Sequence, residues 1–123
     1  MPITDAQYET YLTNRGQYPK NWKQIVAEIR KRSGNRCECV GECGLHDGRD
    51  LFFPKAKRCE EVNGQPAKWA RGKIMLTTAH LCHNPRCARR KHLKHMCQRC
   101  HLRFDLELHK RNSAITRKRA AGL

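Results

Sequence analysis

The sequence predicts a small α+β domain stapled by structural zinc, with an N-terminal helix and a basic C-terminal helix extension. Three observations lead to this prediction. The chain has 123 residues, which allows one domain with a modest hydrophobic core. It contains eight cysteines and seven histidines, and small domains commonly gain stability from metal ions or disulfides. Its hydrophobic spacing is helical near the N-terminus, extended in the middle and helical again near the C-terminus.

The expected compartment favours metal over disulfides. The N-terminal segment MPITDAQYETYLTNRGQYPK has no apolar stretch of the signal-peptide kind, and no apolar run approaches the length of a membrane span. We therefore expect a protein of the cytosol, in a bacterium or a phage-infected host, that does not contact membranes. Thiols stay reduced there, so closely spaced cysteines and histidines indicate zinc.

The net charge of +15, from 26 Lys and Arg against 11 Asp and Glu, indicates a polyanionic partner. A protein with such an excess gains affinity for nucleic acid by releasing counterions, whatever the sequence bound. DNA or RNA is therefore the expected partner. A basic structural binder of the ribosomal type would have the same charge, so charge alone says nothing about catalysis.

The N-terminal part of the chain is expected to contain two helices. Residues 1–18 are predicted to form an arm with a short helix near residues 5–12. Residues 19–32 have the spacing of an amphipathic helix with Asn21 as N-cap, and residues 33–35 end it. The apolar stripe of this helix is expected to face the core and consists of Trp22, Ile25, Val26 and Ile29.

Cysteines then recur at both ends of the domain with spacings typical of zinc ligands. Zinc prefers four tetrahedral sulfur or nitrogen ligands, so a pair from each end would tie the two halves together. We favour the CxxC pair at 97 and 100 together with two of the three upstream cysteines, and leave the pairing open. The candidate ligands are Cys37, Cys39, Cys43, Cys97 and Cys100, with His46 and Cys59 as further donors.

The middle of the chain predicts two strands followed by a helix. Residues 73–81 suit a strand whose alternation places Thr78 and His80 on one face, and residues 92–96 suit a second, short strand. A helix is expected from Gln98 to about residue 110. It would bring His101, Asp105 and His109 to one face, because they recur every four residues.

This region is also strongly cationic. Between Glu61 and Asp105 the chain has ten Lys and Arg and no carboxylate. The loop between the expected strands and the tail from Lys110 onward are each expected to contact phosphates. The loop residues proposed to bind nucleic acid are Arg86, Arg89, Arg90, Lys91 and Lys94.

The order of strand, loop, short strand and helix, with histidines at the first strand's end and on the helix, resembles the ββα-metal motif of the HNH endonucleases. The segment KHLKHMCQRCHLRFD is similar to the family's asparagine-leucine and CxxCH block. IMLTTAHLCH is similar to the AHLDH-type strands of phage-encoded members, and YPKNWKQIVAEIRKRSGNRCECVGECG resembles the start of such proteins. The resemblance spans residues 18–109 and implies an HNH-type nuclease domain at 19–109, followed by a basic tail at 110–123.

The resemblance implies roles for four residues. His80 matches the general base that activates water. His92 occupies the position of the asparagine that orients this base. His101 matches a ligand of the catalytic divalent ion, Mg²⁺ or another, and Asp105 lies where several members place a second ligand. Cysteines of the CxxC match the structural zinc pair. The implied activity is metal-dependent hydrolysis of phosphodiester bonds in DNA, by nicking or double-strand cleavage.

Two departures from the family pattern support an alternative. Ala79 stands where many members have a further metal ligand, and Cys82 stands where similar phage sequences have aspartate. His83 is then an alternative base or ligand, Cys82 with Cys87 could bind another zinc, and His92 could itself be a zinc ligand. The alternative function is a zinc-stabilised nucleic-acid-binding protein on the same scaffold, with weak or no catalysis.

Overall fold

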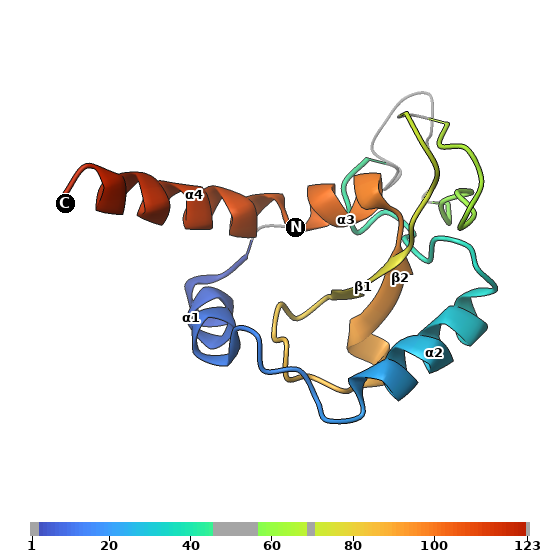
Figure 1. The fold of residues 1–123 in the computed structure, drawn as a ribbon, viewed down its shortest axis with the longest axis horizontal. Helices are drawn as coiled ribbons and strands as arrows, with labels where there is room; N and C mark the ends of the chain where they lie inside the picture. The colour runs from blue at the N-terminus through green and yellow to red at the C-terminus, as the bar shows by residue number, and fades with distance from the viewer. Residues whose placement is uncertain (1–2, 46–56, 69–70, 123) are drawn as a thin grey trace.

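The computed structural model describes residues 3–45, 57–68 and 71–122. Within these residues the fold is a small α+β arrangement of four α-helices and one two-stranded antiparallel sheet (Figure 1). The expected fold class is confirmed at this level. The elements are, in order, α1 (Asp5–Asn14), α2 (Trp22–Ser33), β1 (Thr77–His80), a 3₁₀ turn (Arg90–His92), β2 (Leu93–Met96), α3 (Gln98–Phe104) and α4 (Leu106–Ala120).

The two N-terminal helices lie close to their predicted positions. α1 begins with a capping box, in which Thr4 Oγ1 accepts from the Gln7 amide at 3.1 Å and Gln7 Oε1 accepts from the Thr4 amide at 3.0 Å. Asn21 stands at the N-cap position of α2, but its side chain makes no capping hydrogen bond. α2 ends at Gly34, whose φ of 66° is left-handed and favours glycine.

The sheet pairs Thr77 with Met96 and His80 with Leu93. β1 is shorter than the strand predicted at 73–81, because the residues before Thr77 bond elsewhere. The Ile74 amide donates to the Gln65 carbonyl at 2.8 Å, so this part of the chain pairs with the segment around residues 62–67 rather than with β2. The second strand, predicted at 92–96, is confirmed apart from its first residue.

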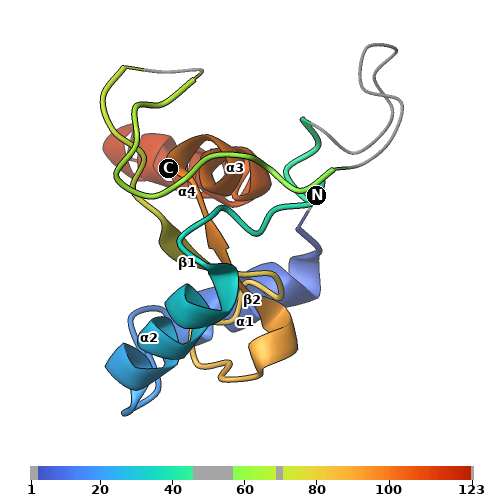
Figure 2. The ribbon, with the colours of Figure 1, turned by 90° about the vertical axis from the view of Figure 1, so that its right-hand side faces the viewer.

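The single helix predicted from Gln98 to about residue 110 is instead two helices that meet at Asp105. Asp105 has φ −89° and ψ 10°, and it caps α3 while preceding α4. α4 continues roughly along the line of α3 and carries the basic tail as helix to Ala120, projecting beyond the other elements (Figures 1 and 2).

The core consists of three clusters. α2 packs its predicted stripe on β2, where Ile25, Ile29 and Leu93 are at most 1% exposed. The N-terminal arm packs on α4 through Ile3, Tyr8 and Leu108. The largest cluster, the sulfur-rich core, consists mainly of cysteine side chains and lies between the sheet, α3 and the chain preceding β1. Its buried members are Cys37, Cys39, Cys43, Ile74, Ala79, Met96, Cys97, Cys100 and Phe104.

Candidate active site and metal centres

A cavity of about 130 Å³ lies where the end of β1, the junction of α3 with α4, and the N-terminal arm meet. His80, His101 and Asp105 line it together, as expected from the sequence. The structure also places His83 there, a residue that the sequence offered only as an alternative base or ligand. The remaining lining is Tyr11, Tyr18, Thr78, Pro85 and Leu108.

Asp105 lies between two imidazoles. Its Oδ2 is 3.0 Å from His101 Nε2, and its Oδ1 is 3.4 Å from His83 Nδ1. The other ring nitrogen of His101 lies 2.6 Å from Thr77 Oγ1, which fixes the orientation of that ring. Three side chains able to bind a divalent ion thus converge on one point.

Local backbone geometry produces this convergence. Strand alternation directs Thr78 and His80 to the cavity, whereas Ala79 between them is fully buried in the sulfur-rich core. Beyond β1 the chain turns sharply, with the His83 amide donating to the His80 carbonyl at 3.0 Å and His83 at φ 60°. The His83 ring then stacks on Phe104 of α3 at 5.0 Å between centroids.

His80 is held as a neutral imidazole. Trp22 of α2 stacks on its ring at 5.0 Å with 13° between planes. Burial lowers the pKa of His80, and a hydrogen bond with the Cys87 backbone and the charge of Asp105 oppose this only in part. His80 Nε2 is buried and has no hydrogen-bond partner among the described residues. It is therefore the ring nitrogen left to accept a proton.

Asp105 is held as a carboxylate. Burial alone would raise its pKa, but hydrogen bonds from His101 and His83 outweigh burial and bring the pKa well below the usual range of an aspartate. An ionised carboxylate beside two imidazoles is a suitable partner for a divalent cation.

The cysteine centre lies on the opposite side of β1. All eight cysteines are in the described residues, and none forms a disulfide. The sulfurs of four of them lie within 4.8 Å of one another, and a tetrahedral zinc with Zn–S bonds of ~2.3 Å needs sulfurs only about 3.8 Å apart. This cluster could hold a structural metal such as zinc, with ligands Cys37, Cys59, Cys97 and Cys100.

The ligand set differs from the favoured set in one member. Cys97 and Cys100 meet Cys37 as expected, but Cys59 is the fourth, because residues 58–63 run antiparallel to residues 35–39. Three backbone hydrogen bonds join these segments, from the Cys59 amide to the Cys39 carbonyl at 2.8 Å, from the Cys37 amide to the Glu61 carbonyl at 2.9 Å and from the Asn63 amide to the Asn35 carbonyl at 2.8 Å.

The other two upstream cysteines form an overlapping group. The sulfurs of Cys39, Cys43 and Cys100 also lie within 4.8 Å of one another. Hydrogen bonds with neighbouring sulfurs, that of Cys37 foremost, raise the pKa of Cys100, and burial adds to this. A bound cation would reverse that preference, because metals bind the thiolate. The further candidate His46 lies outside the described residues.

His92 is not among the residues that line the His80 cavity. It lies at the far end of the loop that joins β1 to β2, with its Nδ1 3.4 Å from Cys87 Sγ. This position suits the metal-ligand role left open by the sequence, and the orienting role implied by the resemblance stays a prediction.

The basic loop is only partly available to a partner. Arg90 pairs with Glu28 of α2 at 2.8 Å, and Lys94 pairs with Glu42. Arg86, Arg89 and Lys91 are exposed. Phosphate contacts from this loop would therefore come first from these three residues.

Comparisons of the chain with models of known families, with curated proteins and with solved structures found no match. The resemblance to HNH endonucleases therefore rests on the sequence motifs alone and stays a prediction. Among the described residues, no helix combines the length and apolar character that spanning a membrane would require.

Proposed function

We propose that the protein hydrolyses phosphodiester bonds in DNA with the help of a divalent metal ion. The observation that carries this proposal is the meeting of the half-buried His80, whose pKa is lowered, with the His83–Asp105–His101 group in one cavity. A base without a proton and a carboxylate between imidazoles are the two parts that metal-assisted hydrolysis needs.

In the proposed mechanism, His80 Nε2 accepts a proton from a water molecule that attacks the phosphate. Trp22 keeps the imidazole in place and shields it, which favours the neutral form. Asp105 and His101 would hold a divalent ion, whose charge would stabilise the negative charge on the scissile phosphate and the leaving 3′-oxygen. Thr77 holds the His101 ring so that its Nε2 faces Asp105.

The ligand types favour some metals over others. With His83, the site offers two imidazoles and one carboxylate, and imidazole suits zinc, nickel and iron better than magnesium. We therefore expect transition-metal ions to support cleavage better than Mg²⁺.

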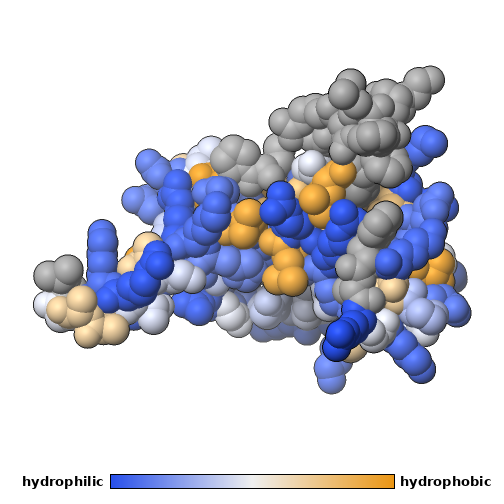
Figure 3. Space-filling model, turned by 90° about the horizontal axis from the view of Figure 1, so that it is seen from above, coloured by the Kyte–Doolittle hydropathy of each residue, from blue (hydrophilic) through white to orange (hydrophobic). Residues whose placement is uncertain are grey.

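Charge supports a nucleic-acid substrate. Hydrophilic side chains predominate on the face shown in Figure 3, and α4 carries five Lys and Arg from Lys110 onward with no acid. This basic helix begins directly after Asp105, so a duplex bound along it would reach the proposed site.

The test is plasmid relaxation by chelator-treated protein, with Mg²⁺, Mn²⁺, Ni²⁺ or Zn²⁺ added back singly. We expect metal-dependent cleavage in the wild type, lost in His80→Ala and His101→Ala and retained in His109→Ala. His109 is a matched control because it is an exposed histidine on α4. Cleavage unaffected by His80→Ala would contradict the proposal.

Ala79 favours a second candidate function. This residue is fully buried in the sulfur-rich core, so position 79 provides no ligand to the cavity. The alternative is a zinc-stabilised nucleic-acid-binding protein without catalysis. Tight, salt-sensitive DNA binding with no cleavage under any of the four metals would establish the alternative.

A further inference from the structure

We propose that a zinc ion binds to Cys82, Cys87 and His92, at a site separate from the cysteine centre that the other six cysteines form. One ligand atom from each of these residues lies within 4.8 Å of those of the other two. Two thiolates and one imidazole are donors that zinc prefers. None of the three belongs to the buried cysteine groups, so the site would add an ion rather than share one.

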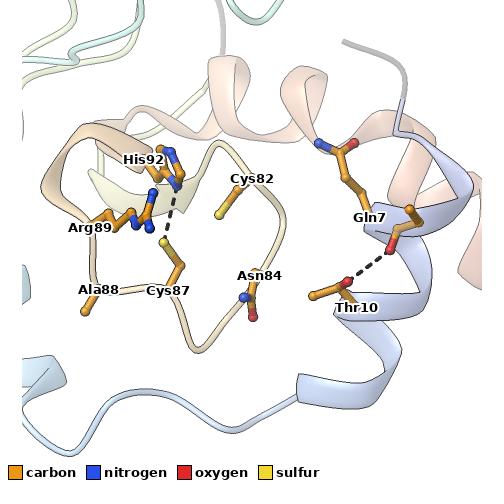
Figure 4. A pocket seen from close by; sticks show the side chains of 9 residues that line it. Gln7, Thr10, Cys82, Asn84, Cys87, Ala88, Arg89 and His92 are labelled. Atoms are coloured by element: carbon orange, nitrogen blue, oxygen red, sulfur yellow. Dashed lines mark hydrogen bonds between the residues drawn. The ribbon is translucent and has the colours of Figure 1, made fainter.

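The three ligands occupy fixed places in the loop between β1 and β2. Cys82 follows the last residue of β1 by two positions, Cys87 lies halfway along, and His92 immediately precedes β2. The Leu81 amide donates to the His92 carbonyl at 2.7 Å, which holds the two ends of the loop together. The side chains of the three ligands turn into the loop, toward one another (Figure 4).

The site opens on a cavity of about 510 Å³ between this loop and α1 (Figure 4). The other described residues lining the cavity, such as Gln7, Thr10 and Arg89, offer no thiol, imidazole or carboxylate. Three protein ligands therefore leave the fourth zinc position facing the cavity, where water can occupy it. Two thiolates balance the charge of the ion, which suits a loop surrounded by arginine and lysine.

A simple thiol–imidazole contact explains less of this arrangement. The distance of 3.4 Å between Cys87 Sγ and His92 Nδ1 fits such a contact, but it gives no reason for Cys82 to lie within 4.8 Å of both. The site also bears on the proposed function and, in this respect, rests on it. Cys87 contacts the His80 ring through its backbone, so a bound ion would fix the loop against the proposed base.

The first test counts metal ions. The protein is purified in the presence of zinc and dialysed against a weak chelator. The number of zinc ions per chain is then measured by mass spectrometry. We expect the Cys82→Ser/Cys87→Ser double variant and His92→Ala each to contain one zinc ion per chain fewer than the wild type. His109→Ala should be unchanged. An unchanged zinc content in a double variant with wild-type circular dichroism would overturn the proposal.

A second measurement uses the wild type, so it does not depend on the folding of any variant. A short pulse of a thiol-alkylating reagent is followed by peptide mapping and by the intact mass. Slow labelling of Cys82 and Cys87, with all eight cysteines reduced, supports the site. Rapid labelling of these two while the six core cysteines stay protected, or a mass lower by two hydrogens, overturns it. Neither readout involves DNA, so failure here is distinct from failure of the nuclease proposal.

Discussion

At the scale of single residues, Trp22 stacks on the ring of His80 and contributes to its burial. The indole lies nearly parallel to the imidazole, and burial is the main cause of the lowered His80 pKa. A general base works only when neutral, so in the proposed mechanism a lowered pKa would keep His80 active at pH values where an ordinary histidine, with a pKa of about 6.5, would be protonated.

The first prediction follows from the lowered pKa of His80. In the wild type, cleavage should fall only when the pH drops below about 6.5. In Trp22→Ala, exposure should raise the pKa of His80, so the acid limb of the pH–rate profile should move to higher pH while the rate near pH 8 is largely retained. The measurement is the cleavage rate between pH 5 and 9 at saturating metal. Val26→Ala, on the same helix, is the control and should leave the profile in place; an identical profile for Trp22→Ala would refute the assignment of His80 as base.

The second prediction concerns Thr77, whose hydroxyl lies 2.6 Å from His101 Nδ1. Partners of this kind orient a metal-binding histidine, and their loss typically costs about 10- to 100-fold in metal affinity or activity. We expect Thr77→Val to raise the concentration of metal needed for half-maximal cleavage by this factor. Thr116→Val is the control, because among the described residues that hydroxyl bonds only to the Asn112 carbonyl of its own helix. Equal metal dependence in the two variants would show that Thr77 does not hold a ligand.

At the scale of elements, α3 and α4 meet at the site. Asp105, at their junction, has a carboxylate that lies between His83 of the loop after β1 and His101 of α3. α4 then needs support of its own. α1 supplies it, because Arg111 pairs with Asp5 at 2.9 Å and Tyr8 donates to Asn112 Oδ1 at 2.7 Å.

The third prediction tests this support. Tyr8 is 8% exposed and packs against Leu108. Truncating a buried aromatic side chain costs several kcal/mol, and in this small cluster we expect Tyr8→Ala to lower the free energy of unfolding by about 2–4 kcal/mol. Leu12→Ala, at a 44% exposed position on the same helix, should change it by less than about 0.5 kcal/mol. Urea unfolding followed by circular dichroism measures both, and similar values for the two would show that α1 does not support α4.

At the scale of the whole molecule, the elements that depend on local pattern were predictable. α1, α2 and β2 follow from residue patterns within their own segments. His80, His101 and Asp105 were predictable as a group, because a strand end and a helix face can be located from the sequence. The helix break at Asp105 was not, since the four-residue recurrence of His101, Asp105 and His109 fits one continuous helix.

The roles of residues whose partners lie far away in the sequence were likewise not predictable. Cys59 joins the cysteine centre only because its segment pairs with residues 35–39, and no spacing signal links it to Cys37. His83 joins Asp105 because a sharp turn after β1 directs its ring back onto Phe104. Both residues have ligand chemistry visible in the sequence, so the missing information was geometric.

The fourth prediction concerns the contribution of the cysteine centre to the stability of the fold. Its sulfurs fill the core where larger apolar side chains would otherwise pack, and hydrogen bonding with neighbouring sulfurs and burial raise the pKa of Cys100. Metal binding must displace protons from such thiols, so a fall in pH should both release the metal and unfold the domain.

We expect zinc release, detected with a chromogenic chelator, to coincide with loss of helical circular dichroism as the pH falls, and EDTA to have the same effect at pH 7. A reducing agent alone should change nothing, because no disulfide is present. A protein that keeps its helical signal after complete zinc removal would show that the apolar clusters on α2 and α4 suffice to hold the fold.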